Sequence, residues 1–142
     1  MWTRRGFRWS RKVLECRCSE VNVPEFAPAP IKPLVSHSVL ESLDVRVGTI
    51  QHIDDVPGSR KLAKLTVAFG DHARTILAGL KQERPDLSVL LGRQALFVVN
   101  LEPRTMAGIV SEGMLFDIGY ADHQLPVLAV PERSVPDGVR AG

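Results

Sequence analysis

The segment NLEPRTMAGIVSEGML, residues 100–115, gathers side chains that could bind a ligand between two apolar, strand-like runs. Arg104 follows a proline that fixes the exit from the first run, and its guanidinium can grip a phosphate bidentately or stack on a base. Met106 and Met114 offer polarizable surfaces to an unstacked base. Core filling is the alternative role for both methionines, and strand alternation favours burial of Met114.

Two neutral side chains flank this group. Asn100 ends the first run, where its amide could bind a ligand or satisfy nearby backbone groups, as asparagines at strand ends commonly do. Ser111 offers a hydroxyl at the start of the second run. A cation, neutral hydrogen-bonding groups and polarizable surfaces are the groups that RNA binding needs.

The sequence predicts no enzyme, metal site or cofactor. Its four histidines are scattered without ligand spacing, and its two cysteines, Cys16 and Cys18, form a lone C-x-C. It contains neither a G-x-S-x-G motif nor a phosphate-binding loop. No run approaches the ~18 apolar residues of a transmembrane helix. We therefore expect a cytoplasmic binding protein with reduced thiols and no membrane partner.

Charge divides the chain into two parts. The net charge is +2, but residues 1–38 carry seven basic and three acidic groups, a balance of +4, so the other 104 residues carry −2. Nucleic-acid binding must therefore depend on a local patch.

Four prolines within residues 24–33 predict a disordered extension over 1–35 and a domain over 36–142. The extension is either a basic tail that adds RNA affinity or the product of a start site placed too far upstream.

Short strands and turns fill the domain. Ser38 and Glu41 fit a capping box for a helix over residues 38–43, and a second short helix fits within 83–93. We expect strands over residues 44–53, 62–69, 74–80, 94–101, 113–119 and 125–130. This spacing favours an all-β OB-fold, a five-stranded Greek-key barrel with a short helix between strands three and four and a C-terminal extension.

NLEPRTMAGIVSEGML closely resembles the signature N-L-x-P-R-x-M-x-G-x-x-S-x-G-M-L of the tRNA-binding domain. That domain occurs at the C-terminus of methionyl-tRNA synthetases, in the endothelial monocyte-activating polypeptide family and in stand-alone bacterial structure-specific tRNA-binding proteins. LDVRVGTI (43–50), SRKLAKLTVAFGDHARTILAGL (59–80) and GRQALFVVNL (92–101) are similar to its other motifs. The similarity runs from about residue 39 to 139.

The resemblance implies recognition of tRNA by shape, without readout of base identity. The tRNA-binding residues it implies are Lys61, Lys64, Asn100, Arg104, Met106, Ser111 and Met114. A pleated strand places Lys61 and Lys64 on opposite faces, and Lys61, beside a turn, is the better placed to contact RNA.

The resemblance also implies partners. Stand-alone members of the family are homodimers, and such a protein could assist an aminoacyl-tRNA synthetase in trans. The apolar residues within 125–136, together with those of 39–43, form the candidate dimer surface. Packing of these residues onto the protomer's own barrel is the alternative.

The chain departs from the family pattern in two places, and other residues, shared with a related branch, leave a second function open. Ser59-Arg60 replaces the usual Ala-Asp, and Ala78 stands where relatives often have serine. Ala107-Gly108 and Ser111-Glu112 are favoured by a sister branch, the bacterial secretion-associated chaperones. The alternative prediction is therefore a chaperone of the same fold that binds unfolded polypeptides.

Overall fold

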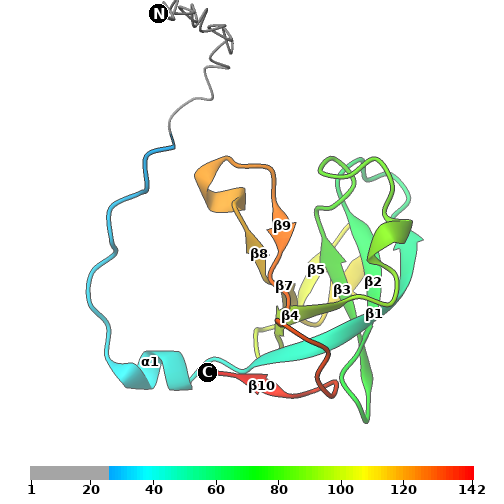
Figure 1. Ribbon diagram of the computed structural model, residues 1–142. Coiled ribbons are helices and arrows are strands. Elements are labelled where there is room, and N and C mark those ends of the chain that lie inside the picture. The colour runs from blue at the N-terminus through cyan, green and yellow to red at the C-terminus, as the bar shows by residue number, and fades with distance from the viewer. Residues whose placement is uncertain (1–25) are drawn as a thin grey trace, which may run out of the picture.

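The structure, a computed structural model, describes residues 26–142 and shows a domain built mainly of short strands (Figure 1). Its elements are α1 (His37–Glu41), β1 (Val45–Asp55), β2 (Ala63–Ala68), β3 (Ala73–Ala78), η1 (Ser88–Leu90), β4 (Gln94–Val98), β5 (Arg104–Met106), β6 (Ile109–Ser111), β7 (Met114–Leu115), β8 (Asp117–Ile118), η2 (Tyr120–Asp122), β9 (Val127–Leu128) and β10 (Arg140–Ala141). The η elements are single 3₁₀ turns.

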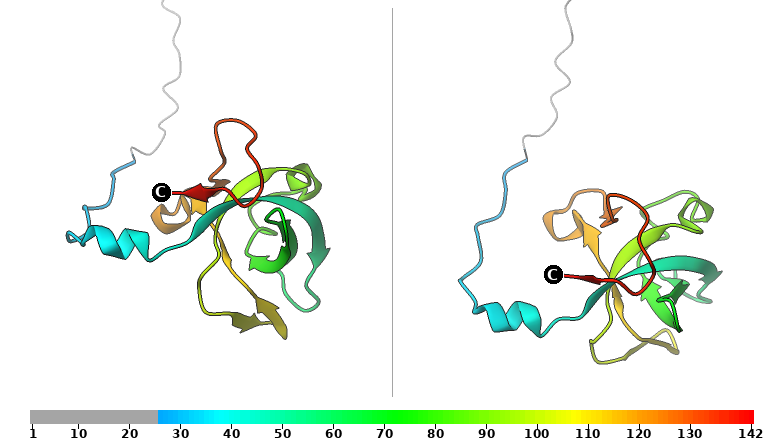
Figure 2. Two further views of the ribbon diagram at one scale, coloured as in Figure 1. Left: turned by 90° about the horizontal axis from the view of Figure 1, so that it is seen from below. Right: turned by 60° about the horizontal axis from the view of Figure 1, so that its bottom comes forward.

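One curled antiparallel sheet forms the body of the domain, which confirms the predicted OB-like fold (Figure 2). Its strand order is β3-β2-β1-β4-β7, and β10 also pairs with β1. β1 is long enough to pair with β4 through its first half and with β2 through its second half. Its register against β2 shifts between Ile50 and His52, which is where an extra residue bends the strand.

The two ends of the curled sheet meet where β3 approaches the segment between β6 and β7. The backbone N–H of Glu112 donates to the carbonyl of Thr75 over 2.9 Å. The Glu112 carboxylate accepts from the N–H of Thr75 over 3.0 Å. Backbone groups at this edge of β3 are therefore bonded within the chain, which closes the barrel.

The core lies inside the curl. β2 alternates as predicted, with Ala63, Leu65 and Val67 fully buried and the residues between them half-buried. Phe97 of β4 packs edge-to-face on Phe69, with ring centroids 5.7 Å apart. These aromatic and aliphatic side chains hold the strands whose ends carry the candidate site.

The C-terminal segment packs back onto the barrel. Val47 exchanges backbone hydrogen bonds with this segment, donating to Val139 over 2.9 Å and accepting from Gly138 over 2.8 Å. The Asp137 carboxylate accepts from Thr49 Oγ1 over 2.7 Å and from Gln94 Nε2 over 2.9 Å. The end of the chain therefore belongs to the protomer's own barrel.

Two predicted helices differ from those observed. α1 begins after Ser36, whose side chain makes no capping bond to the helix, so the capping box of Ser38 and Glu41 is wrong. The helix predicted within residues 83–93 shrinks to the 3₁₀ turn η1. Asp86 accepts from the backbone N–H of Ser88 over 2.9 Å and thereby satisfies a backbone donor at its start.

The predicted strands also differ from those observed. Residues 105–110, where a loop rather than a strand is expected between the runs over 94–101 and 113–119, belong to a hairpin in which β5 pairs with β6. The expected strand over 113–119 divides into β7, which pairs with β4, and β8, which pairs with β9.

Residues 26–36 form no helix or strand and are exposed. Residues 1–25, with the two cysteines, lie outside the described residues. Disorder of the extension therefore stays a prediction.

Candidate functional site

Two adjoining hollows collect most of the predicted site residues. The smaller, about 130 Å³, is lined by Arg104, Met106, Ser111 and Met114. The larger, about 650 Å³, is lined by Lys61 and again by Met114. Leu77 of β3 also borders both hollows. The structure thus brings five of the seven predicted residues to one surface; Lys64 and Asn100 line neither hollow.

The hairpin of β5 and β6 presents Arg104. Arg104 stands opposite Ser111 in the register, and the turn uses Ala107 and Gly108 with φ of +49° and +78°. Two successive positive φ values match the two-residue turns that suit the twist of a hairpin. Arg104 is exposed, and no carboxylate within residues 26–142 forms an ion pair with it. Its guanidinium is therefore available to a phosphate.

Ser111 is buried and serves the fold. Its Oγ accepts from the backbone N–H of Leu77 over 3.0 Å and donates to the carbonyl of Gly113 over 3.1 Å. The Ser111 hydroxyl takes the place of a backbone acceptor that a neighbouring strand would offer at the edge of β3. Its single proton is already donated to the Gly113 carbonyl. Its predicted RNA contact stays a prediction, and the geometry gives it a positioning role beneath Arg104.

Asn100 joins distant segments. Its Oδ1 accepts from the backbone N–H of Asp44 over 2.8 Å, and its Nδ2 donates to the carbonyl of Ser42 over 2.7 Å. These bonds tie the exit of β4 to the junction of α1 and β1. The side chain thereby fixes the path of the segment that leads to Arg104.

The two predicted lysines have different surroundings. Lys64 lies on β2 and its ammonium is 3.0 Å from an Asp54 carboxylate oxygen, which offsets its charge. Lys61 was expected on the same strand but precedes it, in a turn where Ser59 Oγ accepts from its backbone N–H over 3.3 Å. Lys61 is exposed and forms no ion pair among the described residues.

Met114 is nearly half exposed, at 47%, between the two hollows. Its exposure contradicts the alternative of burial in the core, while Met106 is half-buried. In β7 the buried residue is Leu115 rather than Met114. Exposed and buried side chains therefore alternate, but in the order opposite to the one predicted. Met114 therefore presents its thioether to whatever occupies either hollow.

The sequence interpretation missed the far wall of the larger hollow. Asp117 of β8 and Tyr120 of η2 line it, and Tyr120 is 61% exposed. Only a hairpin between residues 117 and 128 brings them there, and no local sequence motif marks that hairpin. Arg84 supports this hairpin by donating to the carbonyl of Pro126 over 3.2 Å, and it also donates to neighbouring Glu83 over 3.0 Å.

A group of arginines lies at the start of β1. The hydrogen bond from Arg46 to Asp44 lowers the pKa of Asp44; partial burial opposes this shift, and the charges of Arg46, Arg140 and Arg74 favour it. Arg74 itself donates to the carbonyl of Glu112 over 3.1 Å. Arg46 and Arg74 are thus bonded within the fold, and none of the three arginines borders either hollow.

Many large apolar side chains are exposed. Among them are Val39, Leu40 and Leu43 at α1, and Phe116, Ile118, Leu125, Val127 and Val130 around β8 and β9. Within residues 26–142, no helix is long and apolar enough to cross a membrane, and no group of three His, Cys, Asp or Glu side chains could hold a metal ion.

Comparison with known proteins agrees with this architecture. The family described as "Putative tRNA binding domain" matches residues 45–140. Methionine--tRNA ligase of Phocaeicola vulgatus is 41% identical over 103 residues, which cover 71% of this chain but only 15% of the ligase. The chain thus spans a small part of that relative.

Solved structures give the same result. A MetRS-related protein from Pyrococcus horikoshii superimposes with a TM-score of 0.72 and 31% identity, over 78% of this chain and all of the other. Chaperone CsaA from Bacillus anthracis str. Ames gives 0.67 and 25%, over 78% and 100%. The C-terminal domain of Plasmodium vivax p43 gives 0.61 and 27%, over 69% and 58%. With a family match over most of its length, the chain belongs to the tRNA-binding domain family.

Proposed function

We propose that this domain binds tRNA by its shape and, through that binding, assists an aminoacyl-tRNA synthetase in trans in the cytoplasm. The observation that carries the proposal is the pair of exposed cations, Lys61 and Arg104, at two adjoining hollows of a tRNA-binding family domain. The relation to a methionine--tRNA ligase supports a role beside a synthetase.

Phosphate contacts suit recognition by shape. Lys61 and Arg104 come from different elements, so only a backbone that follows the surface between them reaches both. Phosphate contacts carry no base information, and each one releases counterions, which makes affinity fall with salt. Among the described residues, only two unpaired cations line the hollows, on a domain without an overall basic charge, which predicts modest affinity for each protomer.

We propose that two protomers act together. The exposed apolar residues at α1 and at β8–β9 form a candidate dimer surface, since single exposed apolar residues are ordinary but a clustered set favours an interface. Residues 135–141, by contrast, bind the protomer's own barrel. A two-fold pair would double the number of cations available to one tRNA.

A chaperone of unfolded polypeptides is the second candidate, favoured by the structural match to chaperone CsaA. The mainly apolar larger hollow is the feature of this chain that would serve it. A denatured polypeptide should then compete with tRNA for binding, whereas a protein specific for RNA is indifferent to it.

The test of tRNA binding is a salt titration of Arg104→Ala. We expect weaker binding and a logarithmic salt slope shallower by about 1, because one phosphate contact is lost. Arg133→Ala is the matched control, since Arg133 is exposed but lines neither hollow. Equal slopes for wild type and Arg104→Ala would refute the role of Arg104.

A further inference from the structure

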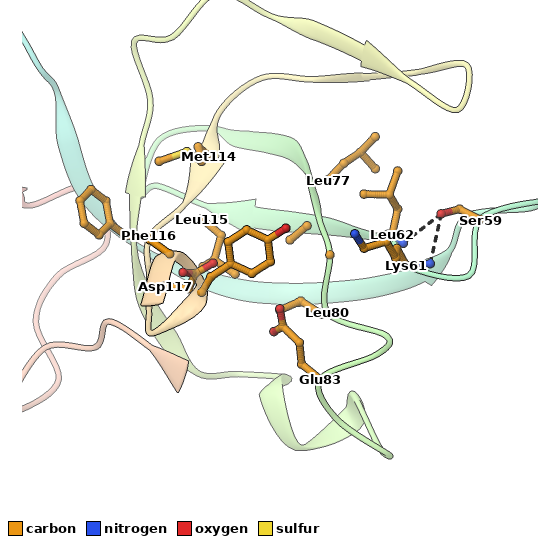
Figure 3. A pocket seen from close by; sticks show the side chains of 14 residues that line it. Ser59, Lys61, Leu62, Leu77, Leu80, Glu83, Met114, Leu115, Phe116 and Asp117 are labelled. Carbon is orange, nitrogen blue, oxygen red and sulfur yellow. Dashed lines mark hydrogen bonds between the residues drawn. The ribbon is translucent and has the colours of Figure 1, made fainter. Parts of the chain in front are cut away.

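The larger hollow has the size and lining of a site for more than a phosphate. Figure 3 shows its two walls: Lys61, Leu62 and Leu77 on one side, and Met114, Leu115 and Asp117 on the other. Its volume of about 650 Å³ lies within the roughly 300–1,000 Å³ of sites that hold small molecules. The volume of one nucleoside is well below the upper limit of that range.

The far wall carries the groups that an isolated base binds. Tyr120 presents an aromatic ring and Met114 a thioether; Tyr120 is mostly exposed and Met114 nearly half exposed. Aromatic side chains stack on unpaired bases because every base has a flat face. Asp117 is exposed at the same wall, and a carboxylate accepts hydrogen bonds from amino and imino groups of bases.

The near wall supplies the charge. Lys61 lies at this hollow, and Arg104 lies at the adjoining one, beyond the shared residues Leu77 and Met114. Cations on both sides of an aromatic and apolar surface complement a nucleotide whose base is inside and whose flanking phosphates lie at the rim.

We propose that the larger hollow receives one unstacked base of the bound RNA, with Tyr120 and Met114 against its face, Lys61 at its phosphate and Asp117 accepting from its edge. This inference rests on the proposed tRNA binding and adds a requirement: the RNA must offer an unpaired nucleotide. The domain therefore binds folded RNA that has exposed bases better than a continuous duplex.

The backbone beside the hollow argues against an extended peptide as the occupant. A peptide that binds as an added strand needs free backbone groups at a sheet edge. On β3, the N–H of Leu77 is taken by Ser111, and both the N–H and the carbonyl of Thr75 are taken by Glu112. A base needs none of these groups.

The walls are held before any ligand arrives. Arg84 fixes the hairpin that carries Tyr120, through the carbonyl of Pro126. On the opposite side, the Lys81 ammonium donates to the carbonyl of Ser59 over 2.8 Å and pairs with Asp55. A preformed hollow lowers the entropy lost on binding.

The test compares Tyr120→Ala, Tyr120→Phe and the control Gln124→Ala, an exposed neighbour outside the hollow. The probes are tRNA and a continuous RNA duplex of similar length, titrated over salt. We expect Tyr120→Ala to lower tRNA affinity about 5- to 150-fold, the range of base–aromatic stacking, without changing the salt slope. Tyr120→Phe and Gln124→Ala should bind like wild type, and duplex affinity should not change.

The outcomes separate this inference from the proposed function. Wild-type tRNA affinity in Tyr120→Ala, alongside a shallower salt slope in Arg104→Ala, would overturn the base site and leave tRNA binding intact. Loss of denatured-polypeptide binding but not of tRNA binding in Tyr120→Ala would make the hollow a peptide site. Absence of salt-dependent tRNA binding by wild type would overturn both proposals.

Discussion

Replacement of Ser111 by alanine isolates the bond that helps to close the barrel. Ser111 is only 3% exposed, and its hydroxyl both accepts from Leu77 and donates to Gly113. Alanine fits the same space but leaves the backbone N–H of Leu77 without a partner at the edge of β3. The change therefore tests whether the side chain maintains the fold, independently of any contact with RNA.

The expected loss of stability follows from burial. A buried donor left unpaired costs about 1–3 kcal/mol, and the lost bond to the Gly113 carbonyl adds about 1 kcal/mol. Ser111→Ala should therefore lower the free energy of unfolding by about 2–4 kcal/mol. This is a large share of the roughly 5–15 kcal/mol that stabilises a typical domain.

Urea denaturation followed by circular dichroism measures this difference. Ser134→Ala is the matched control, because Ser134 is exposed, and none of the hydrogen bonds described within residues 26–142 uses its side chain. Ser111→Cys keeps the shape, with a slightly larger atom and a weaker hydrogen-bonding group, so it should fall between wild type and alanine. A Ser111→Ala protein as stable as the Ser134→Ala control would refute the closure argument.

Three further predictions concern packing, pH and charge. Gly48→Ala should destabilise the domain by more than 1 kcal/mol in urea denaturation, because a Cβ there would lie 2.6 Å from a valine methyl group of β2. The bond from Arg46 holds the pKa of Asp44 below its ordinary 3.8, so the pair stabilises the fold above pH 3.8 and that contribution is lost as the pH falls below it. The urea midpoints of wild type and Asp44→Asn should therefore differ at pH 5 and draw together as the pH falls below 3.8. Lys61→Ala should make the salt slope of tRNA binding shallower by about 1, whereas Lys64→Ala, already paired, should change it little.

Each of these has a clear contrary result. A Gly48→Ala protein of wild-type stability would mean that β1 and β2 can separate without loss. A constant difference between the two urea midpoints down to pH 3 would show that Asp44 is not stabilised as an anion. Equal slope changes for the two lysine variants would show that the ion pair of Lys64 opens for RNA.

Local patterns predicted the strands that form the barrel. Alternation placed Leu65 and Val67 in the core because a pleated strand turns every second side chain inward. The same rule gave the wrong phase for Met114, since β7 has only two residues and β8 joins a different strand. In so short an element, pairing partners rather than pattern decide which side chain is buried.

Long-range bonds explain why roles within the site could not be read from the sequence. The partners of Asn100 lie 56 and 58 residues away, and Leu77 lies 34 residues from Ser111. Polar residues in a signature motif have the same types whether they contact a ligand or hold the backbone. Only their geometry shows that these two side chains already bond within the protein.

Competition between tRNA and a denatured polypeptide distinguishes a tRNA-binding domain from a chaperone of unfolded chains. Labelled tRNA is bound to wild type near its dissociation constant at low salt, and unlabelled tRNA, duplex RNA or denatured polypeptide is added. We expect displacement by unlabelled tRNA, weaker displacement by duplex and none by polypeptide, with affinity that falls as salt rises. Displacement by the polypeptide alone, or tRNA binding that is insensitive to salt, would contradict it.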